Sequence, residues 1–146
     1  MGKIYTALGL MSGTSGDGVD ASIISSDGID QYSEILNKYF EYDQKIHENL
    51  HNLRGKIFKF EDLEKNKNEI NQLEKELTLF HAKIVNEILE TSDENSDFIG
   101  FHGQTIYHNP LKKISKQIGD GNLLSQLSKK TVICNFRQND IKNGGE

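Results

Sequence analysis

Residues 9–21 read GLMSGTSGDGVDA, and this stretch determines what the first part of the chain can form. Its glycines are Gly9, Gly13, Gly16 and Gly18. Between them stand short side chains that carry oxygen: Ser12, Thr14, Ser15, Asp17 and Asp20. Because glycine has no Cβ, such a loop can bring backbone N–H groups close to an anion, and carboxylates suit Mg²⁺. The stretch therefore predicts a cradle for phosphate and magnesium, with a plain hairpin turn as the alternative.

Two common phosphate-binding loops do not match this stretch. The P-loop requires G-x-x-x-x-G-K-[ST], and the loop contains no lysine. The dinucleotide fingerprint G-x-G-x-x-G opens a helix, whereas this chain has G-x-x-G-x-G and is expected to enter a strand. A glycine loop between two antiparallel strands is the phosphate grip of sugar kinases, actin and Hsp70-type ATPases, which is an analogy at the level of fold.

The flanking segments predict an α/β chain. Apolar and β-branched residues predict strands over 4–10, 19–25 and 31–42, which would form an antiparallel meander. Helices are expected over 43–53 and 61–90, because apolar residues in the longer segment recur every three or four positions. These apolar residues form one stripe of the helix, and this stripe is expected to pack in the hydrophobic core. Further strands are expected over 98–101, 114–118 and 131–136, with a helix over 123–127 that residues 120–122 introduce.

Composition limits the classes of partner. The net charge of −5 argues against non-specific binding of nucleic acid or acidic membranes. A single cysteine, Cys134, excludes an internal disulfide framework and suits a reducing compartment. No apolar run approaches the roughly 20 residues of a membrane span. A cytoplasmic protein that works on small molecules, without nucleic acid or membrane partners, is therefore expected.

Three segments carry a family resemblance. They are GLMSGTSGDGVDA, FIGFHGQTIYHNP, and QIGDGNLL followed by TVICNFRQNDIKNGGE, in this order. They resemble the N-terminal part of the anhydro-N-acetylmuramic acid kinases, which carry M-S-G-T-S-x-D-G-x-D, H-G-Q-T, Q-I-G-D and D-F-R-x-x-D-x-x-x-G-G-x-G-A-P. The similarity is strongest over residues 4–26 and 97–146.

The resemblance implies an actin-like, ribonuclease H-like sugar-kinase ATPase lobe, with a mixed sheet and flanking helices. Residues 1–146 would form the first lobe of a bilobal fold, incomplete, with the second lobe outside them. The implied cofactors are ATP and Mg²⁺. The implied reaction converts 1,6-anhydro-N-acetylmuramic acid and water to N-acetylmuramic acid 6-phosphate in peptidoglycan recycling. The enzymes of this family are generally dimeric, so a homodimer of the full-length protein is expected.

The resemblance assigns the phosphate segment to consecutive positions. These are Gly13, Thr14, Ser15, Gly16, Asp17, Gly18, Val19 and Asp20. Asp17 and Asp20 are the candidates for the metal region. The family usually has a bulky apolar residue, often leucine, where this chain has Gly16.

Substrate binding is expected from four residues in the later motifs, namely Gln104, Asp120, Arg137 and Asp140. Three of them have a structural alternative: a cap of the next helix for Asp120, and a surface ion pair for Arg137 and Asp140. The neighbouring His102 lies at the carboxyl end of an expected strand, where it could reach a substrate; the alternative is a structural histidine with satisfied hydrogen bonds. Asn135 stands where the family commonly has aspartate, which removes a negative charge beside Arg137.

Other features of the sequence bear on a metal site and on the competing hypotheses of function. His47 and His51 lie four apart on an expected helix, but one cysteine and no H-E-x-x-H argue against a zinc site. The general base of the family, in a D-T-G-P-G-N motif, does not occur in these residues. The chain is therefore expected to be an N-terminal fragment that is inactive alone. The alternatives are another sugar kinase, or a truncated non-catalytic paralogue that binds a nucleotide or a partner.

Overall fold

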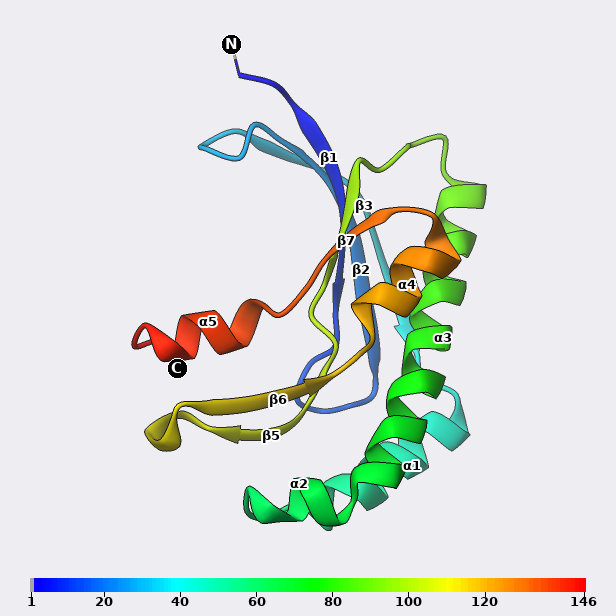
Figure 1. Ribbon diagram of the computed structural model, residues 1–146. Coiled ribbons are helices and arrows are strands. Elements are labelled where there is room, and N and C mark those ends of the chain that lie inside the picture. The colour runs from blue at the N-terminus through cyan, green and yellow to red at the C-terminus, as the bar shows by residue number, and fades with distance from the viewer. Residues whose placement is uncertain (1) are drawn as a thin grey trace.

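Residues 5–41 fold into the antiparallel meander that the sequence predicts. The computed structural model describes residues 2–146. Its first strands are β1 (Tyr5–Met11), β2 (Gly18–Ser26) and β3 (Tyr32–Glu41) (Figure 1). In β2, Val19, Ala21 and Ile23 are fully buried. Their period of two places them on one face of the sheet and leaves the polar residues between them on the other.

A five-stranded mixed sheet organises the chain. Its order is β3-β2-β1-β4-β7. Strands β4 (Phe98–Phe101) and β7 (Thr131–Ile133) run parallel to β1, whereas β2 and β3 form the antiparallel side. Because the carboxyl ends of parallel strands meet at one edge, the segments that follow β1, β4 and β7 emerge together.

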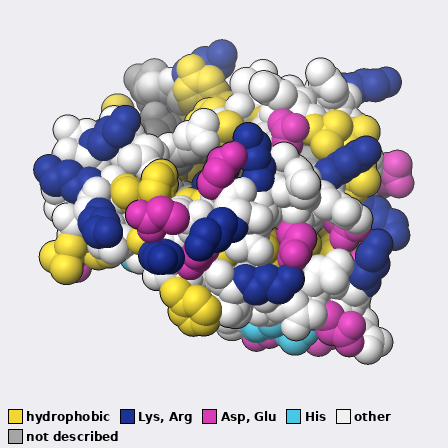
Figure 2. Space-filling model, turned by 60° about the horizontal axis from the view of Figure 1, so that its bottom comes forward, with side chains coloured by type: hydrophobic (Ala, Val, Ile, Leu, Met, Phe, Trp, Pro, Cys, Tyr) yellow, Lys and Arg dark blue, Asp and Glu magenta, His cyan; other side chains and the backbone are white. Residues whose placement is uncertain are grey.

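Helices cover one face of this sheet. Helix α3 (Lys67–Thr91) crosses that face, with α1 (Gln44–Arg54) and α4 (Gly121–Ser128) beside it (Figure 1). The apolar stripe of α3 is buried, with Leu77 and Val85 fully excluded from solvent. The prediction that this stripe is core is therefore confirmed. In Figure 2, where the bottom of the view in Figure 1 comes forward, basic and acidic side chains are interspersed over the surface.

The predicted helix over 61–90 is wrong in one respect, because the structure divides it in two. Helix α2 (Glu61–Lys65) ends at Asn66, and α3 begins at the next residue. The backbone of Asn66 leaves helical geometry at φ −104°, and its side-chain amide donates to the Asp62 carbonyl at 2.8 Å. Short amide side chains compete in this way for helix carbonyls, which explains the break.

Two elements were not predicted. Strand β5 (Gln104–Asn109) pairs with β6 (Ile114–Ile118) in a separate hairpin, joined by a 3₁₀ turn at Pro110–Lys112. Helix α5 (Phe136–Lys142) replaces the end of the predicted strand 131–136. The strand stops early because Asn135 adopts a left-handed conformation at φ 64°, which asparagine tolerates better than most residues.

The other face of the sheet is largely bare of helices. Only α5 lies on that side in Figure 1. An apolar hollow of about 240 Å³ there is lined by Ala7, Gly9, Ser22, Ile24, Phe98, Gly100, Ile133 and Phe136. Ile133 and Phe136 are 44% and 47% exposed. No helix within residues 2–146 combines the length and apolar character that a bilayer crossing requires.

Candidate functional site

The three predicted motif segments converge at one edge of the sheet. The glycine loop follows β1, the His102–Thr105 segment follows β4, and Arg137 comes soon after β7. These strands are parallel, so their carboxyl ends share an edge. Ligands of α/β sheets bind outside such carboxyl ends. The sheet order thus brings together residues that are more than 100 positions apart in the sequence.

The glycine loop is a tight turn with a polar tip. The Gly16 N–H donates to the Gly13 carbonyl at 3.1 Å, and Gly16 has φ +69°. Thr14 and Ser15 are exposed, and within residues 2–146 neither hydroxyl has a hydrogen-bond partner. Both are therefore free to donate to a bound anion. Val19, in contrast, is fully buried, so only its backbone can contact a ligand.

Negative charge surrounds the end of the loop. Asp17 and Asp20 are both exposed. A Cβ at Gly18 would lie 2.5 Å from the hydroxyl oxygen of Tyr39, so the loop passes directly against this ring. Desolvation first, and then the carboxylates of Asp17, Glu41 and Asp20, raise the pKa of Tyr39. This field favours a cation at the loop.

A buried hydrogen-bond cluster fixes the loop from behind. The Gln104 side chain donates to the Gly13 carbonyl at 3.0 Å, and its oxygen accepts from Ser12. The Tyr42 hydroxyl lies 2.6 Å from Ser12 Oγ, and burial raises its pKa to about 12. Ser12 also contacts the Gly18 carbonyl at 2.9 Å. We call Ser12, Tyr42 and Gln104 the loop brace.

The loop brace changes what the sequence suggested for two of its members. Gln104 is fully buried, and both ends of its amide are used inside the protein. Ser12 is 2% exposed, so its hydroxyl serves the loop rather than an anion. A direct contact between Gln104 and sugar stays a prediction. Tyr42 was missed because its role depends on a contact with residues far away in the sequence.

An open cavity of about 440 Å³ lies beside the loop, over β1 and β4. Its lining includes Asp20 and His102, with Gly9, Leu10, Met11, Ser22, Gly100 and Phe136. His102 Nδ1 lies 2.9 Å from the Gly103 carbonyl, so this nitrogen carries the proton and donates. The other ring nitrogen, Nε2, is buried without a partner within residues 2–146. The expectation of a structural histidine with satisfied hydrogen bonds is therefore not fully met, because a buried acceptor normally has a partner.

Asp120 acts as a helix cap. Its Oδ1 accepts the Leu123 N–H at 3.0 Å at the start of α4, and its own N–H donates to Thr78 Oγ1 at 2.9 Å. The capping alternative for Asp120 is therefore observed. A substrate contact would have to use the second carboxylate oxygen, and it stays a prediction.

Arg137 and Asp140 do not form the expected pair. Among residues 2–146 no ion pair joins them, although both lie on α5. The alternative of a surface ion pair between Arg137 and Asp140 is therefore not observed. The Nε of Arg137 is buried and has no partner within the described residues. Asp140 is exposed, and its carbonyl accepts the Gly145 N–H at 2.9 Å.

Helix α1 approaches the loop at Gly16. A Cβ on Gly16 would lie 2.9 Å from Leu50 Cδ2 and 3.1 Å from Arg54. The missing side chain therefore lets α1 pack against the loop, which explains how this chain accommodates glycine where the family has a bulky residue. On the same side, His47 Nε2 lies 3.3 Å from Asp17 Oδ1.

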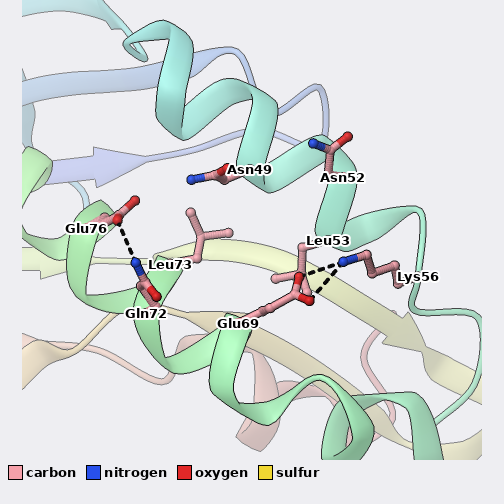
Figure 3. Close-up of a pocket in the computed structure, with 8 residues that line it drawn as sticks. All are labelled: Asn49, Asn52, Leu53, Lys56, Glu69, Gln72, Leu73 and Glu76. Atoms are coloured by element: carbon pink, nitrogen blue, oxygen red, sulfur yellow. Dashed lines mark hydrogen bonds and ion pairs between the residues drawn. The ribbon is translucent and has the colours of Figure 1, made fainter.

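A second hollow, of about 330 Å³, separates α1 from α3 (Figure 3). Its polar side chains are already paired, because Lys56 contacts Glu69 across the hollow at 2.9 Å and Gln72 donates to Glu76 along α3 at 3.4 Å. None of the predicted site residues lines it. We therefore take the carboxyl edge of the sheet as the candidate site.

Comparisons with known proteins agree with the motifs. A family model described as anhydro-N-acetylmuramic acid kinase matches residues 5–146. The anhydro-N-acetylmuramic acid kinase of Pelagibacter ubique (strain HTCC1062) is 62% identical over 146 residues, which cover 100% of this chain and 39% of that protein. Proteins of the same name from Agrobacterium fabrum and Rhizobium etli are 34% and 35% identical, and this chain covers 40% of each.

The chain thus spans about two-fifths of the length of the curated relatives it matches. Its mixed five-stranded sheet and flanking helices agree with the sugar-kinase ATPase lobe that the resemblance implied. The match extends over all three motif segments and the helices between them. This chain belongs to the anhydro-N-acetylmuramic acid kinase family.

Proposed function

We propose that this chain supplies the first lobe of an ATP-dependent kinase that acts in peptidoglycan recycling. The reaction converts 1,6-anhydro-N-acetylmuramic acid and water to N-acetylmuramic acid 6-phosphate. One observation carries the proposal: a glycine loop with free hydroxyls and carboxylates, fixed by the loop brace, at the carboxyl edge of the parallel strands. Phosphoryl transfer depends mainly on positioning and charge neutralisation, and such a loop provides both.

The loop residues fit ATP and Mg²⁺ by their chemistry. Backbone N–H groups over Gly13–Asp20 and the hydroxyls of Thr14 and Ser15 would hold phosphate. Asp17 and Asp20 would hold Mg²⁺ directly or through water, since this ion prefers oxygen ligands. When bound, the nucleotide supplies the phosphoryl group and the cation offsets its negative charge.

The cavity beside the loop fits a sugar. Asp20 and His102 line it, and a turn of the His102 ring would bring its unpaired, buried Nε2 to a sugar hydroxyl. Arg137, Gln104, Asp120 and Asp140 stay candidates for the same substrate. In this scheme the residues of the chain position the O6 of the opened ring towards the loop. The general base that activates water would come from outside residues 1–146.

A second candidate function rests on the bare face of the sheet. The apolar hollow around Ile133 and Phe136 would let a non-catalytic relative bind a partner without turnover. The long helix α3 is not available for this purpose, because its apolar stripe is already buried.

The test is a kinase assay on the full-length protein, with ADP release measured for 1,6-anhydro-N-acetylmuramic acid and a panel of other amino sugars. Asp20→Asn should reduce kcat/KM at least tenfold, because it removes a carboxylate from both the loop and the cavity. Asp30→Asn is the matched control, since Asp30 is exposed in the β2–β3 turn. Turnover of other amino sugars alone would favour another sugar kinase. A stable complex with a partner and no turnover would favour the binding module.

A further inference from the structure

We propose that Asp17, His47 and His51 form a binding site for a divalent transition-metal ion of the zinc type. The ligand atoms of these three residues all lie within 4.8 Å of one another. They come from two elements, the glycine loop and helix α1. We call this group the loop–helix triad. It shares Asp17 with the proposed Mg²⁺ site, but it would take a different class of ion, because imidazole nitrogens supply two of its three ligands.

One pair of ligand atoms in the triad already has the spacing that zinc requires, and the third lies within 4.8 Å of both. Zinc ligands about 2.0–2.2 Å from the metal, at tetrahedral angles, lie roughly 3.3 Å apart. The separation between His47 Nε2 and Asp17 Oδ1 is 3.3 Å. His47 and His51 lie one helical turn apart on α1, with ring centroids 4.3 Å apart. A small side-chain rotation of the exposed His51 completes the third ligand.

The backbone already holds the triad in place. The Asp17 carbonyl accepts the Tyr42 N–H at 2.9 Å, just before α1 begins. Leu50, which lies between the two histidines in the sequence, is fully buried in the core. Since Gly16 has no side chain, α1 packs directly on the loop, and a Cβ there would lie 3.6 Å from His51 Nε2. Metal binding would therefore cost little rearrangement of the backbone.

The donor set selects the class of ion. Neutral imidazole suits zinc, copper, nickel and iron, whereas Mg²⁺ prefers carboxylate, carbonyl and water. Two imidazoles and one carboxylate leave at least one coordination position open, which is the arrangement of accessible rather than closed structural zinc sites. A zinc ion here would hold the Asp17 carboxylate against α1 and so connect the glycine loop to that helix.

The experiment is a Zn²⁺ titration of the purified chain, with the free ion reported by a chromophoric chelator. We expect one ion per chain, retained in a large excess of Mg²⁺. Asp17→Asn, His47→Gln and His51→Gln should each weaken Zn²⁺ binding at least tenfold. All three residues are on the surface, and far-UV circular dichroism checks that each variant is folded.

Two control variants make the assignment specific. His108→Gln removes an exposed histidine of the β5–β6 hairpin, and Asp20→Asn removes the neighbouring carboxylate of the loop. In both variants the dissociation constant for Zn²⁺ should stay within about twofold of the wild-type value. The proposal is overturned if no saturable binding occurs, or if His47→Gln and His51→Gln bind as the wild type does. Equal weakening by His108→Gln would also overturn it. Neither histidine belongs to the proposed kinase site, so failure here leaves that proposal intact.

Discussion

At the scale of single residues, Ser12 is the most constrained side chain of the site. One hydroxyl contacts the Gly18 carbonyl, Tyr42 and Gln104, and all of these groups are buried. Removing it leaves the partners inside the protein without a hydrogen bond, and buried unpaired polar groups are costly. Ser12 also lies beside Gly13 in the chain. The stability of the fold and the shape of the glycine loop therefore both depend on Ser12 Oγ.

Ser12→Ala should lower the free energy of unfolding by about 1–3 kcal/mol, because Gln104 and Tyr42 lose a buried partner. Ser15→Ala is the matched control, since Ser15 is an exposed hydroxyl of the same loop. Its unfolding free energy should stay within about 0.5 kcal/mol of the wild type. Urea denaturation measures both. Equal effects would show that the loop brace does not stabilise the fold.

At the scale of elements, helix α4 depends on the residue that introduces it. Asp120 caps its first turn through Leu123, and Asp120 is also a predicted substrate ligand. Capping and substrate binding make different demands. A cap requires any short side chain that accepts a hydrogen bond, whereas substrate recognition would require the carboxylate.

Asp120→Ala should therefore destabilise the chain by about 1 kcal/mol, and Asp120→Ser should restore most of this loss. Thermal or urea unfolding of the two variants measures the cap. Asn122→Ala, on the exposed side of the same first turn, should change little. If Asp120→Ser restores stability but full-length Asp120→Ser still shows a raised KM for the sugar, the carboxylate binds substrate. A normal KM would leave capping as its role.

Helix α3 carries a buried histidine that makes stability depend on pH. Burial lowers the pKa of His81 to about 4, although its Nδ1 contacts the Leu77 carbonyl at 2.8 Å. The unfolded chain binds a proton near the ordinary histidine pKa, so it holds more protons than the folded chain between about pH 6.5 and pH 4. Stability is therefore full above this range and falls as the pH drops through it.

His81→Gln should flatten this dependence. The contribution of His81 should amount to about 3 kcal/mol between pH 7 and pH 4 in the wild type, and it should be absent in the variant. Unfolding free energies at several pH values give the two slopes. The comparison uses slopes because the substitution also changes packing against Phe101. Parallel slopes would show that His81 does not titrate in this way.

The strands and main helices were predictable because their patterns are local. Strand β4 and strand β6 have the predicted bounds, and β1, β2 and β3 lie within two residues of theirs. Helix α5 was missed because the left-handed turn at Asn135 is set by tertiary packing, not by a repeat in the sequence. The loop could be identified from its residues, but the loop brace could not, since it joins segments that only the sheet order brings together.

At the scale of the whole molecule, the face of the sheet that helices leave uncovered is the main exposed apolar surface. Ile133 and Phe136 remain partly exposed, beside an apolar hollow that includes Gly100. Apolar surface of this kind is normally covered by further protein. The curated relatives are about two and a half times as long as this chain, so they contain residues that could cover it.

The 146-residue chain should therefore self-associate at high concentration, as well as lack kinase activity alone. Light scattering after size-exclusion chromatography should give a mass that rises with concentration. Phe136→Ser should reduce this association, because it removes an aromatic ring from the bare face. Leu111→Ser, in the β5–β6 turn, should not, although Leu111 is 96% exposed. Equal effects of both variants would assign the association to general surface hydrophobicity.

The loop brace also determines when, during synthesis of the chain, the glycine loop can take its final shape. Ser12 and Gln104 are 92 positions apart, so the glycine loop is synthesised long before the side chain that fixes it. On the ribosome, the early hairpin can pair while its tip remains without support. The loop acquires its final shape only when β4 has joined β1 and residue 104 has left the exit tunnel. A nascent or misassembled chain would therefore lack the final shape of the glycine loop.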